Sequence, residues 1–113
     1  MASTEAERLH EIYMAYKEAD RALPKDLRDA ENEEDVVQIL ETVNALKAAY
    51  YRAIRVALDA TGELVEAAFE GARRGNQAIR EARQGAAKLP ERIRLGVSLF
   101  NSVDALITAA DDG

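Results

Sequence analysis

The segment IRLGVSLFNSVDALITAA, residues 93–110, decides the fold, because no other part of the chain is apolar over so wide a face. At helical spacing, its large apolar residues form two stripes: Ile93, Val97, Phe100, Ile107 and Leu95, Leu99, Val103, Leu106. Such a helix needs at least two neighbouring helices to cover it. The segment is shorter than the ~20 residues of a membrane span and includes polar residues such as Asp104, so we expect a core helix and no membrane insertion.

The composition indicates long helices packed closely through alanine. The chain of 113 residues is the length of one domain, and it contains 22 alanines, two prolines and no tryptophan. Leu, Ile, Val, Phe and Met together number only 28, which makes the predicted core thin. We therefore expect a homo-oligomer, most simply a homodimer, in which a second copy buries part of the apolar surface.

The lack of cysteine and of a signal-peptide pattern bears on which reactions the chain can support and on where in the cell it is expected. Without cysteine, the chain has no disulfide, thiolate metal site or cysteine nucleophile. The segment MASTEAERLHEIY lacks the basic start and apolar run of a signal peptide, which predicts a cytoplasmic protein.

Capping signals mark the first two helices. Thr4 and Glu7 form a T-x-x-E capping box, which starts a helix over 5–22 that Pro24 is expected to end. Asn32, followed by three acidic residues, is typical of a second helix start, and this helix is predicted over 33–60. Its expected apolar stripe is Val36, Leu40, Val43, Tyr50, Ile54 and Leu58.

The remaining boundaries give two more helices. Thr61 and Gly62 favour a turn, although one helix continuing through this point stays an alternative. A third helix is predicted over 63–88 and a fourth over 91–109, with Pro90 at its start. The predicted fold is an all-α antiparallel bundle of about four helices, 5–22, 33–60, 63–88 and 91–109, which dimerisation can complete.

Short connections predict that consecutive helices pack against each other. Pairing about Leu89 and Pro90 places Phe100 opposite Ile79. A face of small residues on the third helix, including Gly71 and Gly75, should receive the large side chains of the last helix.

A basic block stands out from an acidic chain. The net charge is −6, yet residues 71–94 hold seven bases and only two acids. The candidate partner-binding residues in this block are Arg73, Arg80, Arg83, Arg92 and Arg94. An acidic protein partner is one interpretation, and a solvated face paired with the acidic first half of the chain is another. Weak nucleic-acid binding is a third, less favoured because the block lacks aromatics for base stacking.

Two carboxylate pairs suggest an enzymatic alternative. Glu31 and Glu34 are spaced i, i+3, and so are Glu63 and Glu66. This arrangement resembles the all-α nucleotide pyrophosphohydrolases, in which paired acids hold magnesium against a triphosphate, and the resemblance implies a magnesium-dependent hydrolase. A helix cap explains the acids near Asn32 without a metal. His10, the only histidine, has no partner histidine and is interpreted as a surface residue.

The sequence therefore favours a non-catalytic interaction module, a small self-associating adaptor or regulator, with no cofactor, no metal and no catalytic residues. The magnesium-dependent hydrolase is the enzymatic alternative. No serine, histidine and aspartate grouping and no phosphate-binding glycine loop supports an enzyme of another class.

Overall fold

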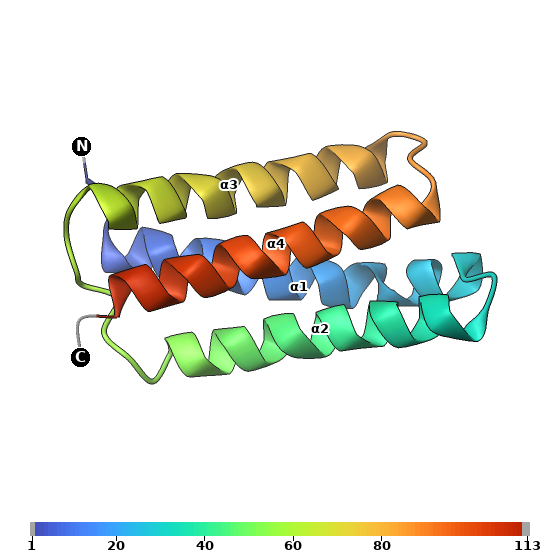
Figure 1. Cartoon of the computed structure of the whole chain (residues 1–113), viewed down its shortest axis with the longest axis horizontal. Helices are drawn as coiled ribbons and strands as arrows, with labels where there is room; N and C mark the ends of the chain where they lie inside the picture. The colour runs from blue at the N-terminus through green and yellow to red at the C-terminus, as the bar shows by residue number, and fades with distance from the viewer. Residues whose placement is uncertain (1, 112–113) are drawn as a thin grey trace.

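The computed structural model describes residues 2–111, which form four helices packed into a bundle of 43 × 25 × 18 Å (Figure 1). The helices are α1 (Glu5–Asp29), α2 (Glu33–Ala53), α3 (Glu63–Gln84) and α4 (Leu89–Ala110). The predicted all-α bundle is confirmed. The predicted turn at Gly62 also exists: this residue has a φ of 119° and precedes α3, so one helix does not run through it.

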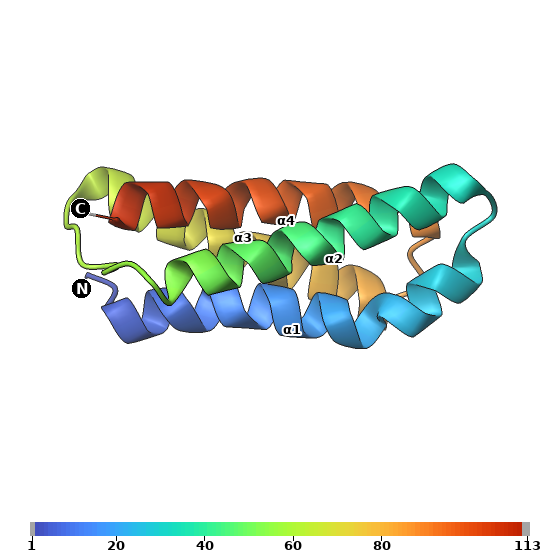
Figure 2. The ribbon, with the colours of Figure 1, turned by 90° about the horizontal axis from the view of Figure 1, so that it is seen from below.

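The bundle consists of two antiparallel hairpins, α1–α2 and α3–α4, which lie side by side (Figures 1 and 2). In this arrangement α1 runs parallel to α3, and α2 runs parallel to α4. The prediction that α2 and α3 pack together is wrong: within the described chain, no Cα atom of α2 comes within 8 Å of a Cα atom of α3. The connection 54–62 instead crosses one end of the bundle between diagonal helices.

Helix α4 is the central helix, as the width of its apolar face predicts. It contacts all three other helices, and its buried side chains include Leu99, Val103, Leu106 and Ile107. Among the described helices, α4 alone is long and apolar enough to cross a membrane by length and composition. In this fold, the rest of the bundle covers Leu99, Val103, Leu106 and Ile107, whereas Val97 is 45% exposed.

Helix α1 does not end before Pro24 as predicted but continues to Asp29. Proline within a helix removes one backbone hydrogen bond and causes a kink, and Figure 2 shows α1 bending near its C-terminal end. The turn after Pro24 is retained because Arg92 of α4 binds the carboxylates of Asp26 and Asp29. This tertiary contact offsets the local cost of the proline.

The other boundaries also shift for tertiary reasons. Helix α2 ends at Ala53 rather than at residue 60, because the following segment folds across the bundle end and buries Leu58. Helix α3 ends at Gln84, where the N–H of Gly85 closes the last turn on the carbonyl of Glu81 at 2.9 Å. Helix α4 starts at Leu89, which is itself buried, so the predicted start at residue 91 is two residues late.

The α3–α4 interface is closest at Gly75. A Cβ atom built on Gly75 would lie 3.0 Å from Cδ1 of Leu99, so the absence of a side chain lets Leu99 enter. The small-residue face therefore receives a large residue of α4, as predicted, and at Gly75 this residue is Leu99. The other glycine of this face, Gly71, has nothing within 4 Å of such a Cβ atom.

This contrast predicts a gain in stability for only one of two matched substitutions. Gly71→Ala should raise the free energy of unfolding by about 0.5–1 kcal/mol, because alanine reduces the entropy of the unfolded chain and nothing obstructs its methyl group. Gly75→Ala should gain none of this, because the methyl group meets Leu99. Urea denaturation of both variants measures the difference. An equal gain at both positions would contradict the close α3–α4 approach.

Candidate interaction surface

The two glutamate pairs lie at opposite ends of the bundle. Glu31 and Glu34 are at the start of α2, whereas Glu63 and Glu66 are at the start of α3 (Figure 1). Over residues 2–111, no group of three or more histidine or acidic side chains is placed to hold a metal ion. The structure does not assemble the magnesium site implied by the resemblance to the pyrophosphohydrolases.

Capping at the start of α2 is carried out by Asn32 and Asp35. The side-chain oxygen of Asn32 accepts a hydrogen bond from the backbone N–H of Asp35 at 2.8 Å. The carboxylate of Asp35 in turn accepts one from the N–H of Glu31 at 3.1 Å. These bonds satisfy N–H groups at a helix end, where acidic side chains are also favoured by the helix dipole.

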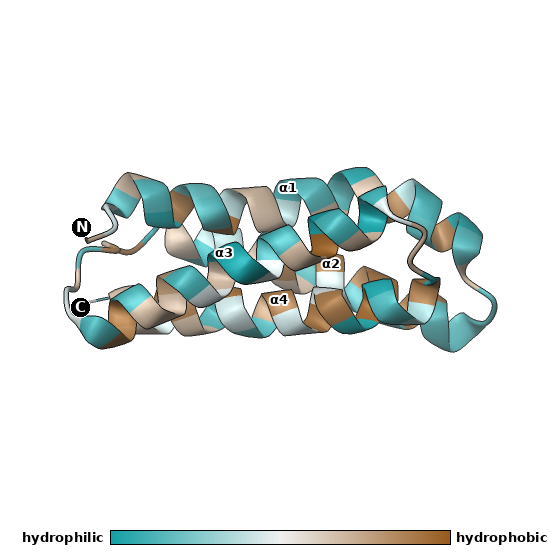
Figure 3. Cartoon of the chain, turned by 90° about the horizontal axis from the view of Figure 1, so that it is seen from above, coloured by the Kyte–Doolittle hydropathy of each residue, from teal (hydrophilic) through white to brown (hydrophobic). Residues whose placement is uncertain are grey.

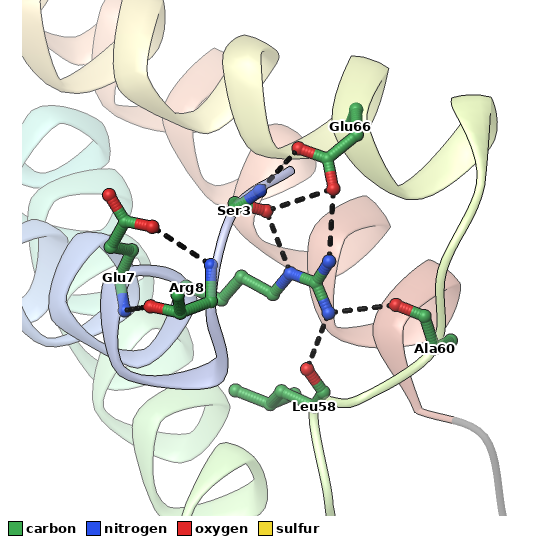
Figure 4. Close-up of polar contacts among 7 residues, drawn as sticks. Ser3, Glu7, Arg8, Leu58, Ala60 and Glu66 are labelled. Atoms are coloured by element: carbon green, nitrogen blue, oxygen red, sulfur yellow. Dashed lines mark hydrogen bonds and ion pairs between the residues drawn. The ribbon is translucent and has the colours of Figure 1, made fainter. Parts of the chain in front are cut away.

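Glu66 belongs to a partly buried network centred on the buried Arg8, which we call the Arg8 network (Figure 4). The guanidinium of Arg8 donates to the carbonyl oxygens of Leu58 at 2.6 Å and Ala60 at 2.8 Å, and it binds the carboxylate of Glu66 at 3.0 Å. Ser3 completes the network, because its N–H and hydroxyl donate to Glu66 and its hydroxyl oxygen accepts from Arg8. The network joins the start of α1 to the crossing connection and to α3.

Sequence reasoning missed Arg8, although a signal was present. Arg8 is only 2% exposed and lies at helical spacing from Ile12, Ala15 and Ala19, the buried residues of α1. The stripe that these residues form includes Arg8 at its first position. A charged residue on a buried stripe indicates an internal hydrogen-bond network.

The five candidate arginines separate into two groups. Arg73 and Arg94 are exposed, and each pairs with a glutamate three residues earlier on its own helix. Arg80 is also exposed, and it binds Glu18 of α1 at 2.6 Å. This hydrogen bond to Glu18 is the main reason why the pKa of Arg80 is raised. The structure thus uses part of the basic block for contacts within the chain.

Arg92 and Arg83 lie deeper. Arg92 is 7% exposed and binds Asp26, Asp29 and the carbonyl oxygen of Ala87. Arg83 is partly buried, and its Nε has no hydrogen-bond partner. Burial is the main cause that lowers the pKa of Arg83. Arg80, Arg83 and Arg92 line one groove beside α1, whereas Arg73 and Arg94 lie outside it.

The outward face of α2 carries exposed apolar side chains. The buried residues of α2 are Ile39, Val43, Leu46, Ala49 and Ala53, so the predicted stripe is wrong at Leu40 and Ile54, which are 39% and 50% exposed. Val37 and Tyr51 are exposed on the same face. The exposed positions recur at alternating spacings of three and four residues, and we call them the α2 seam: Val37, Leu40, Asn44, Lys47, Tyr51 and Ile54.

Comparison with known proteins adds no functional information. No family model matches this chain, and no curated protein or solved structure matches it. The α2 seam and the groove beside α1 therefore carry the functional proposals.

Proposed function

We propose that this protein is a non-catalytic interaction module that self-associates through the α2 seam. The observation that supports the proposal is the spacing of the seam. Exposed apolar residues lie at both of its ends, Val37 with Leu40 and Tyr51 with Ile54, and the polar residues Asn44 and Lys47 continue the 3–4 spacing between them. A 3–4 spacing is the pattern by which one helix packs along another. A helix face that only contacts water is usually dominated by polar and charged residues.

The seam is self-complementary when two copies of α2 pair in opposite directions. With a two-fold axis between residues 45 and 46, a residue lies opposite the partner residue whose number, added to its own, gives about 91. The opposed pairs are Val37 with Ile54, Leu40 with Tyr51, and Asn44 with Lys47. The apolar pairs lie at both ends, and the polar pair lies at the centre, where polar residues specify register in helix pairs.

Charge also favours the antiparallel orientation. The first half of α2 carries four acids and no base, whereas the second half carries two bases and no acid. Antiparallel pairing places the acidic half of each copy beside the basic half of the other, and it opposes the two helix dipoles. A parallel pair would place like charges together.

A single substitution tests the seam. Leu40→Glu should weaken self-association at least about tenfold, because the carboxylate is forced against the apolar Tyr51 twice in a symmetric dimer. Leu64→Glu is the matched control, since Leu64 is 83% exposed on α3 and lies outside the seam. Sedimentation equilibrium measures the dimer fraction. A wild-type chain that stays monomeric at high micromolar concentration would refute the proposal.

Disulfide trapping tests the orientation, because the chain contains no cysteine. We expect an equimolar mixture of Asn44→Cys and Lys47→Cys to oxidise mainly to the mixed dimer, since the antiparallel axis opposes these positions. The two variants differ in mass, so mass spectrometry separates the mixed product from the two homodimers. Predominant homodimers of each variant would indicate parallel pairing.

The proposed role as an adaptor or regulator follows from the assembly. A dimer through α2 leaves α1 and α3 of each copy outward, and hydrophilic residues predominate along these helices in Figure 3. An acidic protein partner remains part of this proposal, with Arg73 and Arg94 as its exposed basic contacts.

A further inference from the structure

A groove of about 390 Å³ lies between α1, the end of α3 and the start of α4. Its volume falls in the range of small-molecule sites, roughly 300–1,000 Å³. Five cationic side chains line it: Arg21, Lys25, Arg80, Arg83 and Arg92. Two carboxylates, Glu18 and Asp26, line it as well, so the formal charge of the lining is strongly positive.

Both carboxylates are already engaged. Glu18 accepts a hydrogen bond from Arg80 at 2.6 Å, and Asp26 binds Arg92 at 3.1 Å. In contrast, Arg21, Lys25 and Arg83 form no hydrogen bond or ion pair with any residue in the described range 2–111. The groove therefore presents three cations whose charge no adjacent carboxylate neutralises through a direct contact.

Of the three cations, Arg83 destabilises the fold most. Its Nε is buried and has no acceptor. Burial is the main cause that lowers the pKa of Arg83; attraction to Asp26 and Glu18 opposes this effect, and the nearby Arg92 adds a smaller repulsion. A buried, unpaired polar group destabilises a fold unless a partner supplies the missing hydrogen bond. An oxyanion in the groove would add a compensating negative charge beside the Arg83 side chain, which lines the groove.

We propose that this groove binds a small organic phosphate that carries at least two negative charges. Guanidinium groups form paired hydrogen bonds with phosphate oxygens, and three cations without a direct ion pair suit a multivalent anion better than a single carboxylate. The groove is also larger than one phosphate group, so it has room for the organic part beside Ala22.

This site is independent of the proposed self-association. No residue of α2 lines the groove, and no cation of the groove belongs to the α2 seam. A chain that fails to dimerise should therefore still bind the anion, and Leu40→Glu provides the variant in which to show it.

Titration calorimetry with inorganic pyrophosphate, at low ionic strength and without added metal, tests the site. We expect saturable binding at one site per chain, weakened about tenfold or more by Arg83→Gln. Arg21→Gln should also weaken binding, and it guards against a folding defect because Arg21 is exposed. The matched control is Arg94→Gln, which removes the same charge outside the groove and should change the affinity less than about twofold.

Three results would overturn the proposal. The first is the absence of saturable heat at millimolar pyrophosphate. The second is an equal loss of affinity in Arg94→Gln and Arg83→Gln, which would indicate diffuse attraction to the basic block. The third is tighter binding of an oligoglutamate peptide than of pyrophosphate, with the same dependence on Arg83, which would assign the groove to an acidic protein segment.

Discussion

Replacing Arg8 with methionine is expected to lower the free energy of unfolding by about 3 kcal/mol. The substitution keeps the side-chain length but removes every donor that serves the carbonyl oxygens of Leu58 and Ala60. It also leaves the carboxylate of Glu66 without its cation. Urea denaturation followed by circular dichroism measures the loss.

The control for this prediction is Arg73→Met. Arg73 also forms an ion pair with a glutamate, but its side chain is 55% exposed, and such pairs contribute only about 0–1 kcal/mol. If the two variants lost similar amounts of stability, the Arg8 network would contribute no more than a surface pair.

The Arg8 network also makes stability depend on pH. The pKa of Glu66 is lowered from 4.5, first by the hydrogen bond from the backbone N–H of Ser3 and also by Arg8. Because the folded pKa lies below the unfolded one, the carboxylate stabilises the fold above pH 4.5, and this contribution is lost as the pH falls through the folded pKa. Glu66→Gln should therefore flatten the acid side of the stability profile.

Leu99→Ala is the second substitution for which we expect a large effect, a loss of about 3–4 kcal/mol. Leu99 is 1% exposed, and its side chain contacts the surface left open by Gly75, so truncation leaves a cavity between two backbones that already lie close together. Phe100→Ala should cost less because Phe100 is only partly buried. Chemical denaturation of both variants ranks them, and a larger loss for Phe100→Ala would contradict the observed register of α3 and α4.

Local signals predicted the elements well, because each depends on neighbours in the sequence. The capping box of Thr4 and Glu7 forms, Asn32 caps α2, and the width of the apolar face of the last helix correctly places it at the centre. Helix ends were less predictable. The turn after Pro24 depends on Arg92, which is more than sixty residues away in the sequence.

The sequence did not predict the helix topology or the composition of the groove, for a related reason. A turn at Gly62 is compatible with either a hairpin or a diagonal crossing, and only the burial of Leu58 and the contacts of Arg8 select the crossing. Likewise, the candidate arginines lie in one block of the sequence, whereas in the fold some of them are exposed and others, such as Arg92, are buried. Arg21 and Lys25, which belong to the first helix, could not be assigned to a groove with Arg83 until the parallel packing of α1 and α3 was known.

The crossing connection bears on folding kinetics. The contacts of Arg8 with Leu58, Ala60 and Glu66 join residues 50 to 58 positions apart, and they exist only once both hairpins have docked. Because closing so long a loop is entropically costly, we expect the hairpins to form first and the Arg8 network to form after the rate-limiting barrier. Contacts that form late slow unfolding rather than speed folding. The Arg8 network would then lower the rate of unfolding and so lengthen the lifetime of the native bundle.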